Sequence, residues 1–258
     1  MPKPTKFLSD EEIEEKAAEV LDAHVEGGRR NPKLPVDVDT LTECAFRFRV
    51  SWESLEDPPG CRTFAALVPT PQSNLFTTNL ILNEKFSDFL QSHSEIERLT
   101  RGHELCHWVI HIDEGMLRSG TLPFDSAEPE VRYHRAQYAA ASLSAEEKTL
   151  LASFALKDER AYKALKGRAV ETDGCIEPDW MHRQAEHFSA CLLVPRLPLY
   201  EELKGGGNPA FYGTHVRLAE LFRVSKRVVQ IRLKKLGLIE EYEPGKFRNV
   251  SVTKGLNF

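Results

Sequence analysis

The sequence predicts an α+β fold, with a small antiparallel sheet followed by a buried helix and then by further helices. The strand pattern occurs at residues 46–50, 64–68 and 79–83, which are short runs of alternating or continuous apolar residues. The helical pattern is longer and covers residues 94–111 and 180–194. A chain of 258 residues can hold one large domain or two smaller ones.

The composition is that of an ordinary soluble globular protein, with 41% hydrophobic and 28% charged residues. No apolar run approaches the roughly 20 residues of a membrane span. The first residues, Met-Pro-Lys-Pro-Thr-Lys, are not those of an apolar signal segment. The five cysteines are scattered and include no Cys-x-x-Cys pair. We therefore expect free thiols and a cytoplasmic protein without a membrane partner.

The N-terminal half begins with a helix that follows Ser9, an N-cap residue with acidic residues after it, and that ends near Val25. A short second helix is expected near Asp37. Asp57-Pro-Pro-Gly is expected to form a turn after the first strand. The helix of residues 94–111 opens with acidic residues in its first turn.

The second half begins with a polar insert, residues 116–178, in which we expect helices at about 136–156 and 158–170. The helix of residues 180–194 follows and is ended by Pro195. Its core stripe consists of Met181, Ala185, Phe188 and Leu192.

Gly205-Gly-Gly-Asn-Pro is the best linker in the sequence, so we divide the chain into residues 1–204 and 205–258. In the second part, residues 215–237 predict two helices joined by a turn, and residues 238–252 predict a terminal hairpin. This pattern is typical of a helix-turn-helix or winged-helix unit.

The predicted helix pair is basic in a chain of net charge −5. Residues 216–237 contain seven basic residues and one acidic residue, a local charge of +6. Contact with nucleic-acid phosphates is one interpretation, and a solvated face or a protein-contact module is the other. The candidate phosphate-contact residues are Arg223, Lys226, Arg227, Arg232, Lys234 and Lys235.

The helix of residues 94–111 carries the pattern His-Glu-x-x-His at His103, Glu104 and His107. Residues four apart lie on one face of a helix, so both imidazoles can reach one metal ion. Zinc suits imidazole ligands and lowers the pKa of a bound water to about 7. We therefore expect one zinc ion per chain, with Glu104 close enough to act on its water.

Such a site needs a third protein ligand. His182 and Glu186, four residues apart on the later helix, are the main candidates, and His187, His134 or a carboxylate of the insert are weaker ones. We expect His111 to pack or to form a hydrogen bond beside the ligands.

Two helical motifs together resemble the ImmA/IrrE-type metallopeptidases, whose site is similar to that of thermolysin-like gluzincins. The first is Arg101-Gly-His-Glu-Leu-Cys-His-Trp-Val-Ile-His111, and the second is Gln184-Ala-Glu-His-Phe-Ser-Ala-Cys-Leu-Leu-Val-Pro195. Residues 35–39 and 218–225 also fit longer members, whereas the insert lies outside the resemblance.

Two departures from the family pattern affect the site. Cys106 replaces a usual Gly, and His182 stands where similar proteins carry a ligand Glu. The following family Asn aligns with Glu186. We expect a three-histidine site with Glu186 as an outer carboxylate, and the inverted arrangement with Glu186 on the metal stays open.

The resemblance implies a zincin-like domain and a zinc metalloendopeptidase that cleaves a regulatory protein, such as a transcriptional repressor, in a stress or mobile-element response. Zinc would polarise the scissile carbonyl and activate water, and Glu104 would pass the water's proton to the leaving amine. The strand near residues 79–83 is expected to bind an extended substrate at a sheet edge. The alternative is a DNA-binding regulator whose metal site is structural or vestigial.

Overall fold

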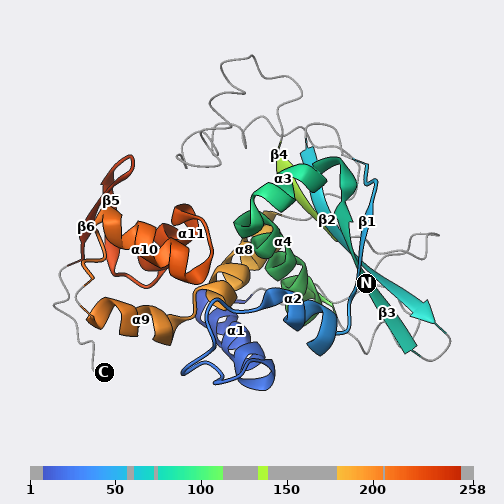
Figure 1. The fold of residues 1–258 in the computed structure, drawn as a ribbon, viewed down its shortest axis with the longest axis horizontal. Coiled ribbons are helices and arrows are strands. Elements are labelled where there is room, and N and C mark those ends of the chain that lie inside the picture. Colours follow the sequence, from blue (N-terminus) through green and yellow to red (C-terminus); the bar gives the residue numbers. More distant parts are fainter. Residues whose placement is uncertain are drawn as a thin grey trace, which may run out of the picture.

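The computed structural model describes residues 8–56, 61–72, 75–112, 133–138, 179–205 and 207–250 (Figure 1). This part of the chain combines helices with two sheets, which confirms the α+β class as a mixture of secondary structure. The larger sheet lies on one side of the central helices, and the C-terminal helices lie on the other side. Among the described helices, none has both the length and the apolar character needed to traverse a bilayer.

The first helix, α1 (Asp10–His24), lies where the sequence predicts it. Ser9 accepts a hydrogen bond from the backbone of Glu12, whose side chain accepts one from the backbone of Ser9, and this capping box starts the helix. Two short elements follow, α2 (Val38–Thr40) and the π-helical turn η1 (Leu41–Ala45).

The larger sheet has the strand order β1-β3-β2-β4. Its strands are β1 (Arg49–Glu53), β2 (Cys61–Gln72), β3 (Leu75–Asn83) and β4 (Tyr133–Tyr138). β2 is antiparallel to β3 and to β4, but β1 is parallel to β3. The prediction of an antiparallel sheet is therefore wrong at β1, because β1 pairs with the second strand of the β2–β3 hairpin and not with the first.

Two further predictions about strands are corrected by this order. Residues 79–83 belong to β3, which pairs with β1 on one side and with β2 on the other, so this segment is not an edge that can take a substrate strand. Residues 136–138, predicted to begin a helix, lie in β4, because β2 offers them a partner for pairing. Residues 116–132 and 139–178 of the predicted insert lie outside the described residues.

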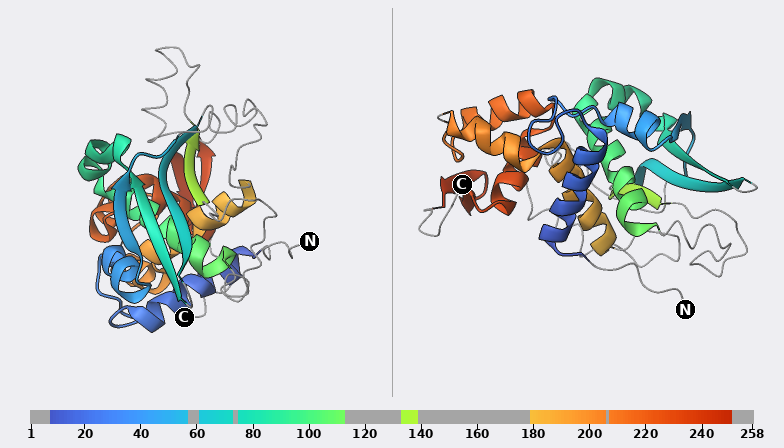
Figure 2. Two further views of the ribbon diagram at one scale, coloured as in Figure 1. Left: turned by 90° about the vertical axis from the view of Figure 1, so that its right-hand side faces the viewer. Right: turned by 90° about the horizontal axis from the view of Figure 1, so that it is seen from below.

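The turn η2 (Glu84–Phe86) and α3 (Ser87–Ser92) lead from the sheet to α4 (Ser94–Cys106). The predicted helix of residues 94–111 is present, but its end widens into a π-helical turn, η3 (His107–His111). π-helical turns inside α-helices occur frequently at functional sites. α4 packs against β2 and against α8 (Asp179–Leu193), and α8 in turn lies beside α1 (Figure 2).

The remaining elements are α9 (Arg196–Lys204), α10 (Tyr212–Phe222), α11 (Lys226–Lys235), β5 (Ile239–Glu243) and β6 (Lys246–Asn249). Of these elements, α9 was not predicted from the sequence, whereas the two helices that follow it and the terminal hairpin lie close to their predicted positions. Ser225 caps α11 by accepting a hydrogen bond from the backbone of Val228, as expected of an N-cap serine. Arg223 lies in the left-handed region, with φ of 50°, at the turn between the two helices.

The C-terminal helices are packed onto the rest of the chain. One hydrophobic cluster includes residues on both sides of the predicted linker, such as Phe188 and Phe222. Arg232 of α11 donates to the carbonyl of Val194 at 3.0 Å and to Glu14 of α1. Residues before and after the predicted boundary at 204–205 thus share one hydrophobic core. The division into two domains stays a prediction.

Candidate metal centre

Three polar residues at the C-terminal end of α4 and the start of η3 are buried: His103 is 1% exposed, and Glu104 and His107 are 0% exposed. Nδ1 of His103, both carboxylate oxygens of Glu104 and Nε2 of His107 are shielded from solvent. Polar groups of this kind are costly to place in an interior unless the surroundings stabilise them. Their burial favours a functional role over a chance pattern on a surface helix.

The preceding residue, Gly102, lets α8 approach α4 closely at this point. A Cβ atom at Gly102 would lie 2.5 Å from Oγ of Ser189 on α8. The Ser189 hydroxyl also donates to the carbonyl of Leu99 at 2.9 Å, which ties the two helices together. The close packing brings the residues of α8 to the His-Glu-x-x-His segment.

His182 of α8 lies next to His103 of α4. Its ring centroid is 5.0 Å from that of His103, and the centroids of His103 and His107 are also 5.0 Å apart. Two imidazoles on one tetrahedral zinc, with Zn–N bonds of about 2.0–2.1 Å, have centroids about 5 Å apart. The centroid separation of each ring pair is compatible with two imidazoles on one zinc ion.

The other candidate ligands differ from His182 in their exposure and in their contacts. Glu186 has a side chain that is 48% exposed, and its Oε1 is 3.4 Å from Nε2 of His182. His187 is 7% exposed and has Asp10 of α1 3.8 Å from its Nε2, so it takes part in the packing of α8 against α1. The side chain of His134 lies outside the described residues. Cys106 is fully buried.

His111 forms hydrogen bonds beside the candidate ligands, which confirms the expectation for this residue. Its Nδ1 is 2.9 Å from Nδ1 of His107, and its Nε2 is 3.1 Å from Oε1 of Gln184 on α8. Gln184 also donates from Nε2 to the carbonyl of Leu8 at 2.9 Å. The sequence analysis assigned no role to Gln184, because only the tertiary structure brings residue 184 next to residue 111.

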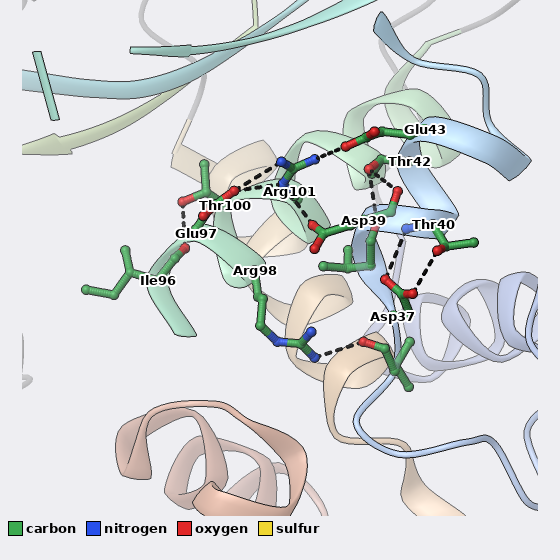
Figure 3. Close-up of polar contacts among 12 residues, drawn as sticks. Asp37, Asp39, Thr40, Thr42, Glu43, Ile96, Glu97, Arg98, Thr100 and Arg101 are labelled. Carbon is green, nitrogen blue, oxygen red and sulfur yellow. Dashed lines mark hydrogen bonds and ion pairs between the residues drawn. The ribbon is translucent and has the colours of Figure 1, made fainter. Parts of the chain in front are cut away.

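Two arginines of α4, Arg98 and Arg101, bind residues on the side of this helix that faces α2 and η1 (Figure 3). The guanidinium of Arg101 lies 3.0 Å from carboxylate oxygens of Asp39, Glu43 and Glu97, and its side chain is only 9% exposed. Arg98 donates to the carbonyl of Val36 at 2.8 Å. These contacts fix α4 against α2 and η1, and so set which face of α4 turns toward α8.

No family model and no curated protein matches this chain.

The donor set fits zinc in chemistry and in ring separation, since imidazole is a common zinc ligand. Within the described ranges, however, no three His, Cys, Asp or Glu side chains are grouped closely enough to hold a metal ion. His103 and His107 form one ring pair, and His182 forms a second ring pair with His103 while it also faces Glu186.

The six candidate phosphate-contact residues do not behave alike. Arg232 is 1% exposed and binds Glu14 and Val194, so it is a packing residue and cannot reach a phosphate from this position. Lys234 and Lys235 are 2.8 Å and 2.5 Å from Glu241 and Asp10, respectively. The other three, Arg223, Lys226 and Arg227, lie at the turn and in the first turn of α11 and are at least partly exposed.

Proposed function

We propose that this chain is a zinc-dependent metalloendopeptidase of the ImmA/IrrE type, acting on a regulatory protein such as a transcriptional repressor. The observation that carries the proposal is the burial of His103, Glu104 and His107 on one helix, with the ring of His182 brought beside them from another. The resemblance of the two helical motifs supports the substrate class.

In this proposal, His103 and His107 hold the zinc ion, and His182 completes the ligand set. When bound, the ion would supply Lewis acidity to a peptide carbonyl and to water. Glu104 follows His103 on the buried side of α4, where its carboxylate can accept a proton from the attacking water. Glu104 then donates that proton to the leaving amine, so the peptide bond breaks without a free amide anion.

A substrate segment in extended conformation has a candidate docking strand in β4. This strand stands at the end of the sheet order, and α4 packs beside it. An edge strand can bind a peptide through main-chain hydrogen bonds, with little demand on the peptide sequence.

Elemental analysis and a peptidase assay test the proposal. We expect one zinc ion per chain, lost in the double variant His103→Ala/His107→Ala. Glu104→Gln should keep the zinc ion but lower the cleavage of a fluorescence-quenched peptide library by about 10²–10⁴-fold, because a proton acceptor is removed. Glu95→Gln, a change of the same kind in the first turn of α4, is the matched control. Zinc retained in the double variant would exclude this metal site.

The second candidate is a DNA-binding regulator with a structural or vestigial metal site. The observation that favours it is the Ser225-capped helix α11, which follows α10 across a short turn and precedes the β5–β6 hairpin. Full biological effect in the Glu104→Gln variant would support this candidate over the peptidase.

A further inference from the structure

A chain of hydrogen bonds runs from the N-terminal segment through α8 to His107. It joins the Leu8 carbonyl, the Gln184 amide, the His111 ring and the His107 ring, with separations of 2.9, 3.1 and 2.9 Å in that order. The three side chains are nearly inaccessible, since Gln184 and His111 are each 3% exposed and His107 is 0% exposed.

The direction of each hydrogen bond follows from the chemistry of the groups. A carbonyl only accepts, so the Gln184 nitrogen must face Leu8 and the Gln184 oxygen must face His111. That oxygen also only accepts, so Nε2 of His111 carries the proton. A neutral imidazole has one N–H, which leaves Nδ1 of His111 as an acceptor. His107 must then donate from its own Nδ1.

We propose that Gln184 and His111 are positioning residues that hold neutral His107 as the tautomer with its proton on Nδ1. In this tautomer Nε2 of His107 carries the lone pair that a metal ion needs. The inference rests on the proposed function in so far as the ligand is zinc. Outer partners of this kind orient ligand histidines and raise their basicity.

The fold explains why two elements are needed for this arrangement. The π-helical turn η3 contains both His107 and His111, whose ring centroids are 4.9 Å apart. Gln184 lies two residues from His182 on α8, so the same helix supplies a candidate ligand and the end of the hydrogen-bond chain. The Leu8 carbonyl fixes the Gln184 amide just before α1 begins.

Nitrogen NMR of the histidine rings in the metal-free full-length protein tests the inference. We expect the proton of His107 on Nδ1 and that of His111 on Nε2. Gln184→Leu removes the acceptor but keeps much of the side-chain volume, so it should give mixed tautomers at both rings. It should also weaken zinc binding by about 10–100-fold, measured by competition with a chromophoric chelator.

Ser189→Ala is the matched control, because it removes a buried hydrogen bond between the same two helices without touching this chain of bonds. Ser189→Ala should have the same histidine tautomers and the same zinc affinity as the wild type. A wild-type spectrum with the His107 proton on Nε2 would overturn the inference, and it requires no variant to fold. The inference also fails if Gln184→Leu binds zinc as tightly as Ser189→Ala. A wild-type protein with the expected tautomers but no zinc binding would support the inference and remove the proposed function.

Discussion

At the residue scale, two residues of α8 are candidates to complete the proposed metal site. The side chain of His182 is 12% exposed, and its ring lies 5.0 Å from that of His103. The side chain of Glu186 is 48% exposed and lies 3.4 Å from His182. This arrangement favours His182 as the ligand and Glu186 as the acceptor of its single N–H, a common partner for ligand histidines.

Substitutions at both positions distinguish the two arrangements. His182→Ala should weaken zinc binding by more than Glu186→Gln, for which we expect a loss of about 10-fold, as for other outer partners. His182→Glu, which restores the family pattern, should keep zinc. Chelator competition on the three purified proteins measures this order. A larger loss in Glu186→Gln than in His182→Ala would place Glu186 on the metal.

At the element scale, the site depends on the close contact of α4 with α8 at Gly102. Gly102→Ala would push a methyl group to within 2.5 Å of the Ser189 hydroxyl. Overpacking lowers the free energy of unfolding by about 1–3 kcal/mol. Alanine forms helix better than glycine, but this gain of about 1 kcal/mol does not exceed that cost. We expect a less stable protein with weaker zinc binding, because His182 is carried by α8.

Urea unfolding and chelator competition check the Gly102 prediction. Adding Ser189→Ala removes the nearest atom, so the double variant should recover part of the lost stability, and the two changes should not be additive. Gly205→Ala serves as the control, because its Cβ would meet its nearest neighbour only at 3.6 Å. Equal stability of Gly102→Ala and wild type would show that the helices separate without cost.

The packing of α8 against α1 and α11 should also depend on pH. Burial is the main cause that lowers the pKa of His187 below its usual 6.5; Arg232 and Lys235 lower it further, whereas Asp10 and Glu14 oppose the shift. Because the pKa is lower in the folded state, the unfolded chain binds more protons below pH 6.5. Stability from neutral His187 is therefore present above that pH and lost on acidification.

Urea unfolding of metal-free protein at pH 7.5 and 5.5 tests the His187 prediction. The free energy of unfolding of wild type should fall more on acidification than that of His187→Gln, which has no group to protonate at this position. The difference between the two proteins isolates His187 from the other histidines. A parallel loss in both would assign the pH dependence elsewhere.

At the scale of the whole molecule, buried polar contacts connect the C-terminal helices to the remainder. Arg232 of α11 reaches Glu14 and Val194, and Arg98 of α4 donates to the carbonyl of Arg223 at 3.2 Å. These contacts join segments that are far apart in the sequence. They make α10 and α11 part of one packed body with α1, α4 and α8.

Arg232 and Arg227, both on α11, should therefore respond differently to substitution. Arg232→Ala should lower the free energy of unfolding by about 1.5–3 kcal/mol, the range for hydrogen bonds to charged groups. Arg227→Ala should change stability by no more than about 0.5 kcal/mol. If the second candidate function holds, Arg227→Ala should instead reduce the salt dependence of DNA binding by about one unit of slope.

Urea unfolding and DNA titrations at several salt concentrations measure these effects in the full-length protein. Lys246→Ala on the β5–β6 hairpin, an exposed residue outside α11, is a control for the general loss of one positive charge. If Arg232→Ala is as stable as wild type, its buried contacts add nothing to stability. If no DNA binds even at low salt, α10 and α11 serve packing or protein contact.

Periodicity and capping residues were sufficient to predict α1, α4, α8, α10 and α11. Ser9 and Ser225 act within one helical turn, so their roles follow from local sequence. The same holds for His103, Glu104 and His107, whose common face is a property of the helix itself. His182 and Glu186 were identified as candidates, but the sequence did not decide which of the two is the metal ligand and which is its outer partner.

The features that only the tertiary structure decided all depend on partners far away in the chain. Three features have no local signal, because each requires a neighbour from another element: the parallel pairing of β1 with β3, the place of β4 at the end of the strand order among the described residues, and the burial of Arg232. The role of Gln184 is of the same kind, since its meeting with His111 depends on how closely α8 packs at Gly102. The sequence determined which residues share a helix face, and long-range packing determined which faces meet.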